Sequence, residues 1–125
     1  EGTSCVLVAY GAMVARCLEA AEALSAEEIG CMVVDLRSLS PLDVPTLGEV
    51  VRSVGRAVVV HEAPRTLGMG AEVVARIVEE AFDHLEAPVR RVTGWDVPYP
   101  PASLEPVYLP DTERISAAVR EVVAY

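Results

Sequence analysis

The sequence contains no lysine, and its ten cationic residues are all arginines. A nucleotide-binding P-loop needs a lysine that reaches the phosphates, so the absence of lysine excludes that motif. The nineteen acidic residues leave a net charge of −9. An acidic surface repels phosphate backbones, so we expect no nucleic-acid partner. The charge instead favours solubility or a basic partner.

Cysteine is scarce, and Cys5, Cys17 and Cys31 form no Cys-x-x-Cys pair, which argues against a zinc site. Widely spaced cysteines in apolar stretches are typical of buried thiols in a reducing compartment. No apolar run approaches the roughly 20 residues that span a bilayer. The first residues also lack a signal-peptide pattern. We therefore expect a cytoplasmic protein without membrane contacts.

Length and composition favour one domain over residues 1–125. Aromatic residues are few, and the 52% hydrophobic fraction consists mainly of Val, Ala and Leu. This mixture suits a buried parallel sheet covered by alanine-rich helices. Short apolar runs predict four strands, at 5–10, 31–36, 57–60 and 89–93. Helical periodicity appears in the intervals and after the last strand, which predicts a three-layer α/β/α sandwich with a mainly parallel sheet.

Helix boundaries are predicted from capping chemistry. Gly30 and Gly55 are expected to end the first two helices, because glycine accepts the left-handed conformation. Ser40 or Asp43 is expected to cap the start of the second helix, and Asp111 that of the last. Residues 94–110 contain five prolines and are predicted to form an extended, ordered loop.

His61 is the main candidate for chemistry, since it directly follows the third predicted strand. Parallel sheets bind ligands at this edge, so a His61–Glu62 acid/base pair is one hypothesis. Adjacent residues do not easily face each other, and a structural histidine in the loop at 61–70 fits as well. Gly68 and Gly70 resemble a phosphate-binding loop only weakly; close packing or positive φ is the alternative.

Three aromatic residues, Trp95, Tyr99 and Tyr108, lie among the prolines of the long loop. They fit either a partner site or anchors that hold the loop to the core. His84 is predicted to be an exposed residue near a helix end.

Longer motifs carry a family resemblance. They are His61-Glu62-Ala63-Pro64-x-Thr66-x-Gly68-x-Gly70-Ala71-Glu72, Leu85-Glu86-Ala87-Pro88-Val89-x-Arg91-Val92-Thr93-Gly94-x-Asp96-x-Pro98-x-Pro100 and Leu104-Glu105-Pro106-x-Tyr108-Leu109-Pro110. In this order they resemble the C-terminal, transketolase-like domain of β subunits in 2-oxo acid dehydrogenase decarboxylating components. The last motif most resembles branched-chain (2-oxoisovalerate) members, and pyruvate members are very similar. Leu67 departs from the pattern, since many members have glycine there.

The resemblance implies an α₂β₂ enzyme that uses thiamine diphosphate and Mg²⁺. Such an enzyme decarboxylates a 2-oxo acid and acylates the lipoyl group of a dihydrolipoyl acyltransferase. Catalytic and cofactor-binding residues would lie in the α subunit and upstream in β. This chain would be a fragment of a longer β subunit, with no catalytic, cofactor or metal residue of its own.

The implied role of this domain is assembly and docking. Its partners would be the α subunit, a second β subunit and the subunit-binding domain of the acyltransferase. The resemblance assigns acyltransferase binding to Glu86 and, if Tyr125 is the natural end, to its terminal carboxylate. The subunit interface is predicted to involve His61, Glu62, Pro64, Gly68 and Gly70.

Two alternatives remain open at this point. One is the C-terminal domain of another transketolase-like thiamine enzyme, such as deoxyxylulose phosphate synthase. The other is a stand-alone α/β enzyme that uses His61. The choice of 2-oxo acid is not predicted, because substrate contacts would lie outside this domain.

Overall fold

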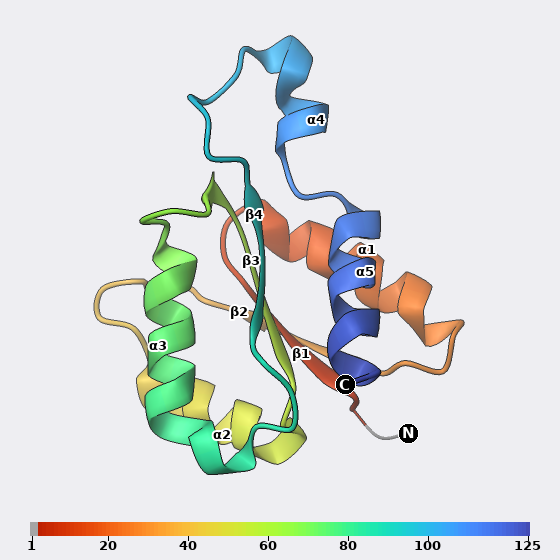
Figure 1. Ribbon diagram of the computed structural model, residues 1–125, viewed down its shortest axis with the longest axis vertical. Helices are drawn as coiled ribbons and strands as arrows, with labels where there is room; N and C mark the ends of the chain where they lie inside the picture. Colours follow the sequence, from red (N-terminus) through yellow and green to blue (C-terminus); the bar gives the residue numbers. More distant parts are fainter. Residues whose placement is uncertain (1–2) are drawn as a thin grey trace.

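The sheet consists of parallel strands in the order β2-β1-β3-β4, in a computed structural model that describes residues 3–125. Every pairing between neighbouring strands is parallel (Figure 1). The strands are β1 (Cys5–Ala9), β2 (Cys31–Asp35), β3 (Ala57–Pro64) and β4 (Arg90–Gly94). Their carboxyl ends therefore meet at one edge of the sheet, which we call the carboxyl edge.

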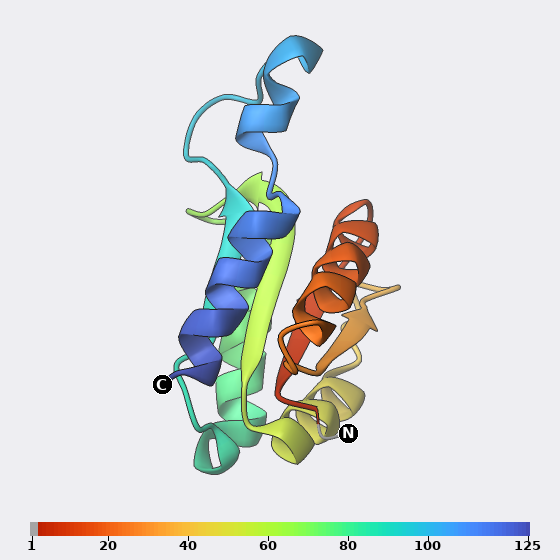
Figure 2. The same ribbon diagram turned by 90° about the vertical axis from the view of Figure 1, so that its right-hand side faces the viewer.

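Helices cover both faces of this sheet, and the predicted three-layer sandwich is confirmed. Helices α1 (Met13–Ser25) and α5 (Thr112–Val123) pack together on one face, with α2 (Val44–Val54) and α3 (Met69–Ala81) on the other (Figures 1 and 2). Such coverage explains the continuous apolar strands, because a parallel sheet is buried on both sides.

Strand β1 divides the hydrophobic core in two. Its five residues are all buried, and their side chains alternate between the faces. Cys5 and Leu7 pack toward α1 and α5, whereas Val6 and Val8 pack toward α2 and α3. Full burial of each Val or Leu contributes about 1.5–3 kcal/mol, so loss of the helices on either face would expose a complete half of the core.

Three of the predicted caps are present. The Asp111 Oδ1 accepts a hydrogen bond of 2.8 Å from the backbone N of Arg114 at the start of α5. Asp43, rather than Ser40, caps α2 by accepting from the backbone N of Thr46. Gly55 ends α2 with a φ of 81°.

The prediction for Gly30 was wrong. Helix α1 ends at Ser25, and the left-handed residue after it is Glu28, with a φ of 62°. The carbonyl of Gly30 instead accepts the backbone N–H of Ser4, at 2.7 Å, where β1 begins.

Two loop predictions also need correction. Strand β3 continues through His61 to Pro64, where it pairs with Gly94, so the predicted loop begins later. Residues 94–110 are not wholly extended, because they include the 3₁₀ helix η2 (Ala102–Leu104) and the short helix α4 (Glu105–Tyr108). The prolines of this segment are compatible with both short helices, since proline is tolerated at the start of a helix.

Residues 95–110, here called the arm, project beyond the carboxyl edge (Figure 1). At the opposite end of the molecule, α3 stops at Ala81 and the 3₁₀ helix η1 (Phe82–His84) leads into β4. His84 is exposed, as predicted. Within residues 3–125, no helix combines the length and apolar character that crossing a membrane requires.

The capping hydrogen bond of Asp111 predicts how much stability is lost when this side chain is removed. Asp111→Ala should lower the free energy of unfolding by about 1 kcal/mol, because the backbone N–H of Arg114 in the first turn of α5 then loses its hydrogen-bond partner. Urea denaturation followed by circular dichroism measures this. Glu22→Ala, which removes the same charge from the exposed side of α1, is the control and should cost less than about 0.5 kcal/mol. Equal losses in the two variants would contradict a capping role.

Candidate functional site

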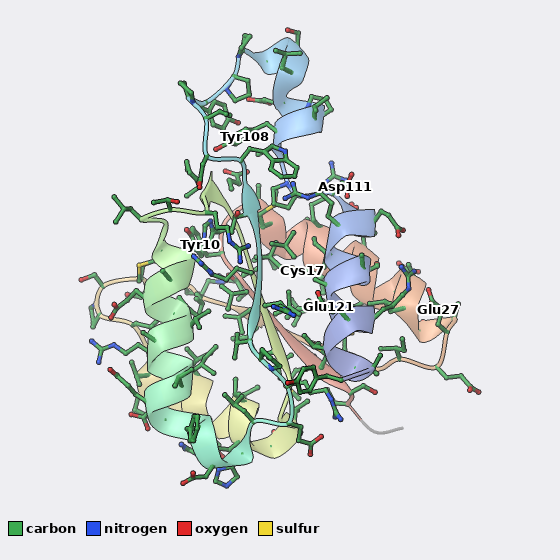
Figure 3. All side chains as sticks on the ribbon, in the orientation of Figure 1. Tyr10, Cys17, Glu27, Tyr108, Asp111 and Glu121 are labelled. Atoms are coloured by element: carbon green, nitrogen blue, oxygen red, sulfur yellow. The ribbon has the colours of Figure 1, made fainter. Side chains whose placement is uncertain are left out.

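His61 occupies the centre of the carboxyl edge and is completely buried. Its ring stacks on Tyr10, with a centroid separation of 6.0 Å and an interplanar angle of 24°. Figure 3 places Tyr10 at this edge, beside the start of α3. The crevice where parallel sheets commonly bind ligands is therefore filled by two side chains of the protein itself.

Gly68 and Gly70 make room for the imidazole. A Cβ at Gly70 would lie 2.3 Å from the His61 Nε2, and one at Gly68 would lie 2.7 Å from its Cε1. Gly68 has an extended φ of −73°, so its freedom to adopt positive φ is not used. Close packing, the alternative to a phosphate loop, explains both residues.

Burial lowers the pKa of His61, and the nearby charge of Arg91 lowers it further, against an opposing interaction with the backbone of Ala63. Neither ring nitrogen has a hydrogen-bond partner of normal geometry. His61 is thus neutral at pH 7. Glu62, the next residue along the strand, makes no hydrogen bond to either ring nitrogen. The His61–Glu62 pair therefore lacks the geometry of an acid/base dyad.

The loop after β3 is fixed to the loop after β4. Asp96 accepts hydrogen bonds from the backbone N and the hydroxyl of Thr66, at 2.9 and 2.7 Å. These two bonds hold the pKa of Asp96 below its usual value. Leu67 stands at the tip with a φ of 60° and is 98% exposed. The glycine common in the family suits this left-handed position without the strain that leucine carries.

The arm is braced against the sheet by its aromatic residues. Tyr108 is buried against Gly94, where a Cβ would lie 2.6 Å from the phenolic oxygen (Figure 3). The Arg114 guanidinium stacks 4.5 Å above the Trp95 ring, and the Trp95 indole N–H donates to the carbonyl of Val107. Tyr108 is therefore an anchor, whereas Trp95 and Tyr99 remain half exposed.

Exposed apolar side chains gather on the arm. We define the arm surface by five such residues: Trp95, Val97, Tyr99, Leu104 and Val107. Val107 is the most open of these, at 74% exposure.

The two predicted acyltransferase contacts meet at the opposite end of the molecule. Glu86 and Tyr125 line one open groove, with a volume of about 580 Å³, between α3 and the end of α5. The Glu86 carboxylate is also paired with the Arg56 guanidinium at 2.7 Å, a contact that the sequence did not reveal.

The predicted interface residues differ in accessibility. His61 and Gly70 are buried and so have no surface for a direct contact. Glu62, Pro64 and Gly68 are half-buried and remain predictions. His61 and Gly70 act instead as support for the neighbouring loop.

Metal and thiol chemistry find little support. In the part of the chain that the structure describes, no three His, Cys, Asp or Glu residues are grouped closely enough to hold a metal ion. Burial raises the pKa of Cys5 and Cys17 to about 12, so both thiols are protonated at neutral pH.

Residues 1–115 match the family model described as "Transketolase, C-terminal domain". The chain belongs to the transketolase C-terminal domain family. Among its relatives, the pyruvate dehydrogenase E1 component subunit beta of Leifsonia xyli is 48% identical over the whole chain. The 3-methyl-2-oxobutanoate dehydrogenase subunit beta of Mycobacterium tuberculosis is 46% identical over 98% of the chain.

This transketolase C-terminal domain spans only 37% and 36% of the length of those two relatives. Among solved structures, a split-gene transketolase described as an inactive beta4 tetramer is 34% identical, with a TM-score of 0.79. The match covers 99% of this chain and 39% of the chain in that structure. A 2-oxoglutarate:ferredoxin oxidoreductase from Magnetococcus marinus, at 15% identity and a TM-score of 0.67, shares the fold. The resemblance inferred from the motifs is confirmed.

The close contact between Gly70 and the His61 ring predicts that the effects of mutations at these two positions on stability are strongly coupled. Gly70→Ala should destabilise the domain by about 1–3 kcal/mol, because the new methyl group overlaps the His61 ring. In a His61→Ala background the same change should cost much less, since the ring is gone. Chemical denaturation of both single variants and the double variant measures the coupling. An equal cost of Gly70→Ala in both backgrounds would show that the ring is not what the glycine accommodates.

Proposed function

We propose that this domain provides assembly and docking surfaces in the β subunit of a 2-oxo acid dehydrogenase. The match of nearly the whole chain to part of the β subunits of such enzymes carries the proposal. The whole enzyme would decarboxylate a 2-oxo acid and transfer the acyl group to a lipoyl group. Relatives with pyruvate and with branched-chain substrate names are almost equally similar, so the proposal extends to both substrate classes.

We infer that thiamine diphosphate and Mg²⁺ bind outside this domain. Among residues 3–125, no three His, Cys, Asp or Glu side chains are grouped closely enough to hold a metal ion. Buried His61 fills the crevice that a diphosphate would need. In the whole enzyme these groups would be held by other parts of the α and β subunits.

Assembly is the role proposed for the arm surface. Its two aromatic residues are exposed but held in place, Trp95 by Val107 and Arg114 and Tyr99 by Glu105, so they lose little conformational entropy on contact. The arm's charged groups are engaged internally, since Asp96 binds Thr66 and Glu105 accepts a hydrogen bond from Tyr99. An apolar face whose two carboxylates are already hydrogen-bonded within the domain suits the centre of a permanent subunit interface. The partners would be the α subunit and a second β subunit.

Docking is the role proposed for the groove at Glu86 and Tyr125. The protein is strongly acidic, which would steer a basic module such as the subunit-binding domain of the acyltransferase. Glu86 and Tyr125 lie 39 positions apart in sequence yet line one groove, which supports a shared site.

The assembly role predicts the effect of a charge on the arm. In the full-length β subunit, Val107→Asp should block association with the α subunit or with a second β subunit, because burying an unpaired carboxylate is costly. Sedimentation velocity of the mixed subunits measures the assembled species. Leu18→Asp, on the exposed face of α1, is the matched control and should assemble normally. Full assembly of the Val107→Asp enzyme would contradict this role of the arm.

A further inference from the structure

The groove that contains Glu86 and Tyr125 is mainly apolar. Helix α3 contributes Val74 and Val78, η1 contributes Phe82, and the segment before β4 contributes Leu85 and Pro88. Phe82 is 69% exposed although it lies beside other apolar side chains. Such a cluster at a concave surface is typical of a site that receives an apolar group.

The charges beside the groove are largely neutralised within the domain. The Glu86 Oε2 lies 2.7 Å from an Nη1 of Arg56, a side chain that is only 26% exposed. Arg90, which follows the groove residue Val89, pairs with Glu121 of α5. A docking cation would therefore share Glu86 with Arg56 rather than meet a free carboxylate. Rim pairs of this exposed kind contribute about 1 kcal/mol or less.

Apolar burial is the larger source of affinity at such a site. A side chain placed against the walls loses its contact with water, and each buried CH₂ group contributes about 0.8 kcal/mol. The carboxylate can still orient the partner, since the Glu86 side chain remains 57% exposed beside Arg56. Recognition at the groove thus favours a basic module that also carries an apolar side chain.

We propose that the groove binds an aliphatic side chain of the acyltransferase's subunit-binding domain, next to a cation that contacts Glu86. This inference rests on the proposed docking function and specifies its chemistry. Contact with the walls, more than charge, then decides the affinity.

A second copy of this chain is a poorer occupant. If the groove lay on a two-fold axis between two copies, two concave surfaces would face each other, and neither could fill the other. A basic module with a protruding apolar side chain does not have this problem.

Calorimetric titration of the subunit-binding domain into the assembled enzyme tests this inference. Phe82→Ser in the β subunit should weaken binding about ten-fold or more, as expected for an anchor contact. Glu86→Gln should weaken it less than about five-fold. Leu18→Ser removes an exposed apolar side chain from α1, far from the groove in sequence, and should have no effect. The heat-capacity change on binding should be clearly negative, because apolar surface is buried.

The possible results separate the inference from the function on which it rests. A larger effect of Glu86→Gln than of Phe82→Ser, with a heat-capacity change near zero, would overturn the apolar site and leave docking intact. No binding to the unmodified enzyme would overturn both. Self-association that Phe82→Ser abolishes would assign the groove to a second copy and overturn the inference. Sedimentation of every variant shows whether the enzyme is still assembled.

Discussion

The packing of the His61 ring against the backbone of Gly68 and Gly70 determines what the carboxyl edge can do. It places a buried, neutral imidazole where many parallel sheets bind ligands. It also fixes the first turn of α3 against β3, from which the loop at Leu67 extends. Because the centre of this edge is filled from within, we assign the proposed functions to the arm beyond it and to the groove at the other end.

The two surfaces differ in electrostatic character. On the arm, the exposed apolar residues are held by Arg114 on Trp95 and by Tyr108 on Gly94, and the local charges are satisfied internally. Such a face suits a permanent contact made during assembly. The groove at Glu86 is smaller, concave and bordered by paired charges, which suits a separate module that binds after assembly. We infer that one domain divides these roles between its ends.

The fold was well predicted because hydrophobic periodicity and helix capping depend on residues that are close together in the sequence. Apolar runs gave all four strands, and Asp111 marked the start of α5. Contacts between distant segments were not predictable in this way. The extension of β3 to Pro64 depends on pairing with Gly94, and the fit of Tyr108 over that glycine depends on the arm's path. Burial of His61 could likewise not be predicted, since the sequence at a strand end does not tell which distant segments cover it.

The protonation state of His61 tests most directly the central claim that a buried imidazole fills the carboxyl edge. The NMR signals of its ring, assigned with the His84→Gln variant, can be followed while the pH is lowered. We predict a pKa below the ordinary value of 6.5, because the buried ring resists protonation. Less than half of the His61 rings should therefore be protonated at pH 6.5, and protonation at lower pH should destabilise the fold, since the unfolded chain binds that proton more readily. A pKa at or above 6.5 in the folded domain would mean an open, solvated edge and would contradict this structure-based assignment.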